Sequence, residues 1–142
     1  MGYSISANIF PVEFQHAATN LADATNYYFA DFPALAATSL TTAREFQLMR
    51  DCVLIAVNIE SIVAGTLASN EASTLAIRSN NTTDNVLSTA ITYTAAFQQI
   101  AVTGLSVFYA ANTKIQAKLT SATFATNPTN VYTALTLWFA AV

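Results

Sequence analysis

The sequence predicts an all-β fold, an antiparallel jelly-roll-like β-sandwich of about eight strands with an irregular or partly helical N-terminal arm. Short runs of β-branched and aromatic residues recur at regular spacing after residue 26, and turn-forming residues separate them. No long amphipathic helical pattern interrupts these runs. At 142 residues the chain has the length of one domain that can bury a core without disulfides.

The first 26 residues are predicted to form an arm, separate from a jelly-roll domain at residues 27–142. They show no clear period of two, and they contain Pro11, which suits the first turn of a helix. One or two helical turns within Val12–Ala24 and an irregular arm that lies on a neighbouring subunit fit the residues equally well. We expect this arm to dock the protein on a larger assembly of which it is one component.

Strands account for most of the remaining chain. The predicted strands are 26–32, 44–49, 52–62, 73–79, 86–93, 96–102, 105–109, 113–119 and 131–139. The long apolar run at 52–62 is expected in the core, with Cys52 as a buried thiol. The sequence NNTTDN at 80–85 is the strongest turn signal in the chain.

Two of these strands predict how their faces are used. Residues 113–119 alternate cleanly, which places one set of side chains inward and the other outward. The inward set is Ile115, Ala117 and Leu119, and the outward set is Lys114, Gln116 and Lys118. Residues 131–139 carry apolar or bulky side chains on both faces. We therefore expect the outer face of that last strand to meet a neighbouring subunit.

The composition predicts extensive contacts between subunits. Hydrophobic residues make up 54 % of the chain and charged residues 9 %, and the net charge is −3. Such a surface protects a monomer poorly against association, whereas an obligate oligomer tolerates it. The alternative is a monomer that is merely rich in Thr and Ala. The scattered basic residues argue against nucleic acid as a partner, and no membrane span or secretory signal is predicted.

Few residues are available for catalysis or metal binding. The single His16 excludes a multi-histidine metal site, and the single Cys52 excludes an internal disulfide or a zinc knuckle. Three glycines cannot build a phosphate-binding loop, and no carboxylates have calcium-loop spacing. We therefore assign no catalytic, cofactor-binding or metal residues and expect no enzyme. A Ser–His–Asp relay through His16 and a glycosidase carboxylate pair assembled across strands remain minor alternatives.

Two strings in the second half resemble a recurring pattern in structural proteins of bacteriophages. They are AGTLASNEASTLAIRSNNTTD at 64–84 and TGLSVFYAANTKIQAKLTSATFATNPTNV at 103–131. The matching positions are Ala64, Gly65, Asn70, Glu71, Arg78, Asn80 to Asp84, Thr103 to Ser106, and Ala125 to Val131. The chain departs from the pattern at Ala111-Asn112, where a Gly-Asp turn is usual, and at Phe124, where Trp is commoner.

The resemblance implies a jelly-roll domain on a virion, commonly a homotrimer, on the capsid exterior or on a tail fibre, and it transfers no catalytic residues. The chain begins at Met1, ends just after its last predicted strand and lacks fibre-shaft repeats, which favours a complete capsid decoration or cement protein bound to the major capsid protein. The alternative is a receptor-binding head or adaptor of a tail fibre or spike. Such a head would use loops 65–73 and 124–130 to recognise a host surface glycan, whereas an adaptor would be carried on other tail proteins.

Five aromatic residues in the second half leave a related question open. They could stack on sugars in a receptor-binding tip, or they could belong to the core or to a trimer interface. The residues are Tyr93, Phe97, Phe108, Tyr109 and Trp138.

Overall fold

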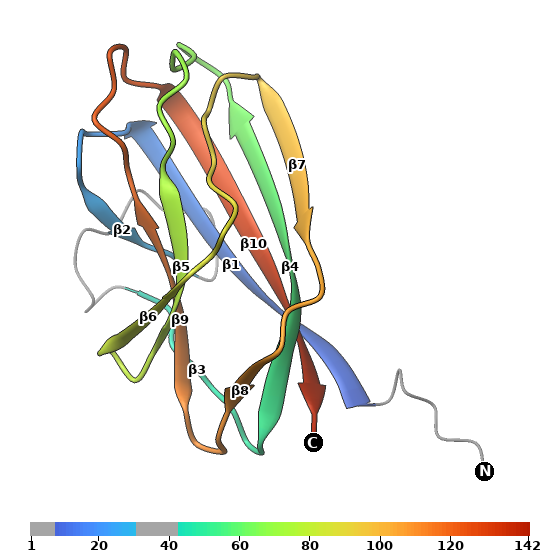
Figure 1. Cartoon of the computed structure of the whole chain (residues 1–142). Helices are drawn as coiled ribbons and strands as arrows, with labels where there is room; N and C mark the ends of the chain where they lie inside the picture. The colour runs from blue at the N-terminus through green and yellow to red at the C-terminus, as the bar shows by residue number, and fades with distance from the viewer. Residues whose placement is uncertain (1–7, 31–42) are drawn as a thin grey trace.

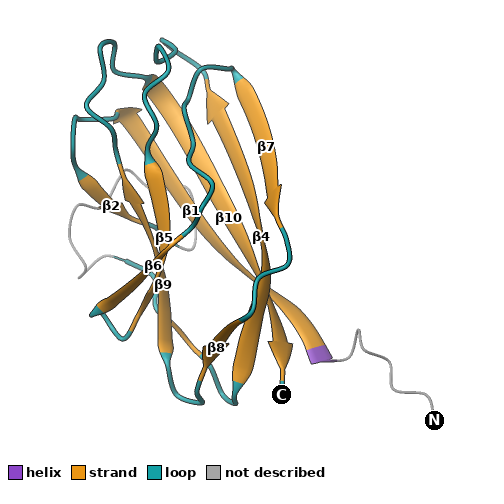
Figure 2. Ribbon diagram, in the orientation of Figure 1, coloured by secondary structure: helices purple, strands orange, loops and turns teal. Residues whose placement is uncertain are grey.

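The computed structural model describes residues 8–30 and 43–142, and it shows two antiparallel sheets packed face to face as a β-sandwich (Figures 1 and 2). Sheet A has the order β1–β10–β4–β7, and β8 also pairs with β4. Its strands are β1 (Ile9–Asn20), β10 (Thr129–Ala141), β4 (Cys52–Val63), β7 (Phe97–Val102) and β8 (Val107–Tyr109).

Sheet B has the order β2–β9–β5–β6, and β3 also pairs with β9. Its strands are β2 (Asn26–Tyr28), β9 (Lys114–Thr120), β5 (Thr74–Ser79), β6 (Thr83–Val86) and β3 (Phe46–Gln47). The predicted all-β class is therefore confirmed. Within the described ranges, no helix is long and apolar enough to cross a membrane.

The N-terminal prediction is wrong for residues 9–20, which form neither a helix nor an irregular arm. They form the long strand β1, which pairs with β10 from Ile9 opposite Ala140 to Asn20 opposite Thr129. Even-numbered side chains of β1 point into the core, so Phe14 is fully buried. Residues 9–20 are thus part of the sandwich, while residues 1–7 of the predicted arm lie outside the described residues.

The position of β1 at the edge of sheet A explains why it tolerates a proline. Pro11 has no N–H to donate, which is harmless where that group would face away from the neighbouring strand. Further along the same edge, the Arg44 guanidinium donates a hydrogen bond to the Glu13 carbonyl. Gln15 then exchanges backbone hydrogen bonds of 2.8 and 2.7 Å with Ala30. These contacts close the β1 edge against an additional strand.

Other strand predictions are confirmed in part. The long apolar strand extends over Cys52–Val63 as β4, and Cys52 is fully buried. The predicted turn closes the β5–β6 hairpin through a 3.1 Å hydrogen bond from the Thr82 amide to the Ser79 carbonyl. Its two central residues, at positions 80 and 81, have φ of 49° and 61°, a conformation that asparagine tolerates well.

Three predicted strands keep less than half of their expected length. The strand predicted at 86–93 is wrong over most of its length, because β6 ends at Val86 and only Ile91 makes an isolated bridge, to Ser73. The strand predicted at 44–49 is reduced to β3. The strand predicted at 26–32 is reduced to β2, and its residues 31 and 32 lie outside the described part of the chain.

The outward set predicted on β9 is also partly wrong. Ile115, Ala117 and Leu119 are buried as predicted, but Gln116 is fully buried as well. β9 lies between other strands of sheet B and is not an edge. The charged groups there pair with one another: Asp84 contacts both Arg78 (3.2 Å) and Lys118.

Candidate interaction face

The outer face of sheet A is a candidate interaction site, and we call it the A face. It consists of the side chains that alternate with core-facing residues on β1, β10, β4, β7 and β8. The register aligns them in four rows across the sheet. The rows are Pro11–Trp138–Ala56, Glu13–Thr136–Asn58–Ala101, Gln15–Ala134–Glu60–Gln99 and Ala17–Tyr132–Ile62–Phe97. Phe108, on β8, lies beyond the first row, opposite Val53.

Apolar side chains occupy both ends of the A face. Trp138 is 37 % exposed and Phe108 59 % exposed at one end, while Ile62 (45 %) and Phe97 (59 %) lie at the other. Exposed apolar groups that gather on one face are typical of interaction surfaces. The strand sequences and the register place them together; the composition of the chain alone does not.

The middle rows of the A face are polar and linked by hydrogen bonds. The Tyr132 hydroxyl donates to Gln15 Oε1 (3.0 Å), and Gln15 Nε2 donates to Glu13 Oε1 (3.3 Å). Gln99 Nε2 donates to Glu60 Oε1 (3.1 Å). Partial burial and the two nearby carboxylates raise the pKa of Tyr132. The four rows contain these two carboxylates and no lysine or arginine, so the face is acidic and suits a neutral or basic partner surface.

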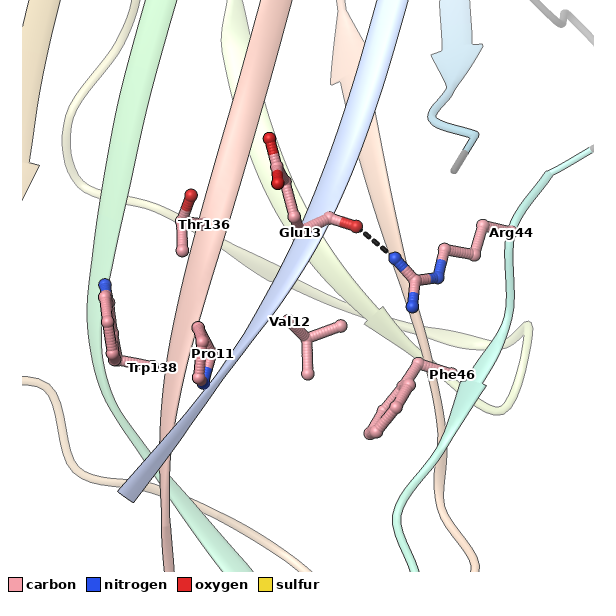
Figure 3. Close-up of a pocket in the computed structure, with 7 residues that line it drawn as sticks. All are labelled: Pro11, Val12, Glu13, Arg44, Phe46, Thr136 and Trp138. Carbon is pink, nitrogen blue, oxygen red and sulfur yellow. Dashed lines mark hydrogen bonds between the residues drawn. The ribbon is translucent and has the colours of Figure 1, made fainter. Parts of the chain in front are cut away.

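A shallow pocket of about 420 Å³ lies where the A face meets the β1 edge (Figure 3). Its lining comes from β1, β10, β3 and the segment that leads into β3. The lining residues are Pro11, Val12, Glu13, Arg44, Phe46, Thr136 and Trp138. The Arg44 guanidinium lies 5.2 Å from the centroid of the Phe14 ring and 5.7 Å from that of Phe46, so it builds one wall of the pocket.

The five aromatic residues that could stack on sugars or belong to the core or an interface fall into two groups. Tyr93 and Tyr109 are buried, which confirms a core role for them. The Tyr93 hydroxyl is hydrogen-bonded to the Thr133 hydroxyl (2.9 Å), and burial raises its pKa. Phe97, Phe108 and Trp138 lie on the A face. The sequence could not separate the groups, because Phe108 and Tyr109 are consecutive and Trp138 lies between two apolar residues. For these strand residues, the register fixes which side faces the core.

The loops 65–73 and 124–130 meet at one end of the sandwich. The Gly65 amide donates to the Thr129 carbonyl (3.2 Å), and the Ala125 amide donates to the Glu71 carboxylate (2.9 Å). The latter bond, with others from nearby amides, lowers the pKa of Glu71. A Cβ on Gly65 would lie 2.2 Å from Thr129 Oγ1, so only glycine fits this approach. The two strings that resemble phage proteins therefore contact each other here.

His16 lies in the core of the sandwich and not in an irregular segment. Its ring packs against Tyr27 and Phe29, with a centroid distance of 5.2 Å to each. Neither ring nitrogen has a hydrogen-bond partner within the described residues. Burial lowers its pKa from 6.5 to about 4. The alternation of Val12, Phe14, His16 and Ala18 is a strand signal, but Pro11 in the same segment argues against a strand unless that strand lies at an edge.

Neither a scan against models of protein families nor a search of curated proteins returns a match to this chain. Within residues 8–30 and 43–142, no group of three or more His, Cys, Asp or Glu side chains is arranged to hold a metal ion.

Proposed function

We propose that this protein is a structural component of a bacteriophage particle, a capsid decoration protein that binds the outside of the head. In this proposal it is a homotrimer that contacts the major capsid protein and stabilises the shell by packing between subunits. The observation that carries the proposal is the A face, a broad sheet surface with exposed apolar groups at both ends. Its location on a phage particle rests on the resemblance of the two strings described above.

The physical basis is burial of the A face against another protein surface. Burial of apolar surface contributes about 25 cal/mol per Å², and a specific interface removes about 800 Å² from each partner. The gross gain is largely offset by the loss of rigid-body and side-chain freedom on association. Each of the many copies bound to one shell would contribute the net free energy that is left after this offset.

The proposed fold within the sandwich class is the jelly roll, and the strand pairing supports it. The pairs are nested: β5 with β6, β4 with β7 and β8, β2 and β3 with β9, and β1 with β10. Nested pairs arise when one long hairpin is wrapped into two facing sheets. The order β1–β10–β4–β7 facing β2–β9–β5–β6 is the arrangement expected of such a wrapped hairpin.

Rebinding to capsids tests the location. Labelled protein is mixed with phage heads stripped of accessory proteins and, separately, with host cells. We expect saturable binding to the heads and none to the cells. The decoration role would be refuted if the protein adsorbed to host cells, if added polysaccharide blocked that adsorption, and if the protein did not bind to heads.

A matched pair of variants tests the A face. Ile62→Lys places a charge among the apolar groups of the face, and Val86→Lys places the same charge on β6 of sheet B, where Val86 is 62 % exposed. We expect Ile62→Lys to weaken binding to heads at least tenfold and Val86→Lys to leave it unchanged. Equal effects of the two variants would show that the A face is not the contact surface.

Recognition of a receptor by a tail-fibre head is the second candidate. The observation that favours it is the meeting of loops 65–73 and 124–130 at one end of the sandwich. Several polar groups of these loops are already engaged in holding the loops together, which leaves fewer of them for a glycan. The cell-adsorption arm of the rebinding experiment distinguishes this candidate from the first.

A further inference from the structure

The two edges of sheet A differ in whether another strand can add to them. The β1 edge is closed by Pro11, by the guanidinium of Arg44 and by the Gln15–Ala30 bridge. The β7 edge is the other end of the sheet, and within the described residues no strand pairs with its outer side. β7 lies at the boundary of the molecule in Figure 1. Its sequence, FQQIAV, contains no charge, proline or glycine, the features that usually protect an edge.

The phase of the ladder identifies which backbone groups of β7 are free. The Val63 amide donates to the Ala96 carbonyl (3.0 Å), so even-numbered residues of β7 direct their N–H and C=O groups toward β4. The odd-numbered residues Phe97, Gln99 and Ala101 direct theirs outward. The same three residues place their side chains on the A face.

We propose that β7 pairs with β7 of a second copy of this chain, antiparallel and about a two-fold axis at Gln99, so that two A sheets become one continuous sheet. In this register Phe97 lies opposite the partner's Ala101, and Gln99 lies opposite the partner's Gln99. Every residue with outward backbone groups then exchanges hydrogen bonds with an opposite residue inside the strand. A two-fold at Ile100 would instead leave Phe97 opposite the partner's Thr103, which lies beyond the strand.

The side chains favour a second copy over an unrelated strand. The large ring of Phe97 is matched by the small side chain of the partner's Ala101, and the match is repeated by symmetry. Gln99 meets another amide, and no like charges face each other across the pair. The proposed contact joins the backbone edges of two A sheets, whereas the proposed capsid contact covers the A face itself.

Engineered cysteines test the register in the isolated full-length protein. Gln99→Cys brings two thiols together at the two-fold, where opposite Cα atoms of a hydrogen-bonded pair are about 5.5 Å apart, a spacing that a disulfide accepts. Phe97→Cys is the matched control on the same strand and face, because its own copy would lie about 14 Å away along the strand. The natural Cys52 is buried and does not interfere.

We expect mild oxidation to convert most of Gln99→Cys to a covalent dimer of twice 15.2 kDa, with at least a fivefold lower yield for Phe97→Cys. Equal yields from the two variants, or no dimer from Gln99→Cys, would overturn the proposal. Gln99→Pro gives a second readout, because it removes an outward N–H and leaves the backbone ladder to β4 in place, with loss of the side-chain bond to Glu60. We expect this variant to keep a single cooperative urea transition and to lose the two-fold association in light scattering; unchanged association would contradict the pairing. If the protein does not bind to capsids, the expected cross-linking and light-scattering results stay the same, because they are measured on the isolated protein.

Discussion

Replacement of His16 by leucine should remove a dependence of stability on pH that the fold imposes. The imidazole is buried and packs against the rings of Tyr27 and Phe29, and neither nitrogen has a hydrogen-bond partner within the described residues. A charged imidazolium there would lose its hydration without compensation. The folded protein therefore holds the ring neutral, with its pKa lowered from 6.5 to about 4.

The sign and size of the effect follow from proton linkage. Between pH 6.5 and 4 the unfolded chain binds a proton at His16 that the folded chain does not, so the free energy of unfolding falls as the pH is lowered. Above pH 6.5 both states are neutral and the group contributes no slope. The full effect is about 3 kcal/mol at about 1.4 kcal/mol per pH unit, and about 2.5 kcal/mol of it is reached by pH 4.5.

Urea denaturation at fixed protein concentration measures this change in the free energy of unfolding. The native sequence and His16→Leu are compared at pH 7.5, 6.5, 5.5 and 4.5. Leucine fills much of the same space, does not titrate and leaves no unpaired ring nitrogens. We expect the native protein to lose about 2.5 kcal/mol more than the variant between pH 7.5 and 4.5. Parallel profiles for the two proteins would refute the reasoning, because they would mean that the ring titrates equally in both states. The histidine proton signals in NMR give an independent reading of the folded-state pKa.

Three further outcomes are expected. Gly65→Ala should lower the free energy of unfolding by about 1–3 kcal/mol, because its Cβ would lie 2.2 Å from Thr129 Oγ1. Thr129→Ala in the same chain should restore part of this loss. Additive effects of the two changes in urea denaturation would contradict the clash. Tyr93→Phe should cost about 1–2 kcal/mol by leaving the buried Thr133 hydroxyl without its partner, and a neutral result in thermal unfolding would show that the bond contributes nothing. The Cys52 thiol, whose pKa burial raises, should react with a thiol reagent only in denaturant, so rapid labelling of the folded protein would contradict its position in the core.

Part of the candidate site was predictable from the last strand alone. Residues 131–139 carry bulky side chains on both faces, and that pattern predicted that the outer face of β10 makes contacts. The structure places Trp138 of that strand beside Pro11 on the A face. The other contributors, Phe97, Phe108 and Ile62, come from separate strands. Only the register brings them to the same surface, since a shift of one residue would turn each of them to the opposite side.

The sequence by itself determined the strand character of β4, β5 and β9, because alternation and apolar runs are local properties that bury one side of a pleated segment. It also predicted the turn at 80–85 from residues that tolerate positive φ. What only the tertiary structure decided is the state of residues 9–20. Proline is unfavourable in a central strand and harmless at an edge, and whether Pro11 lies at an edge depends on β10, more than a hundred residues away in the chain.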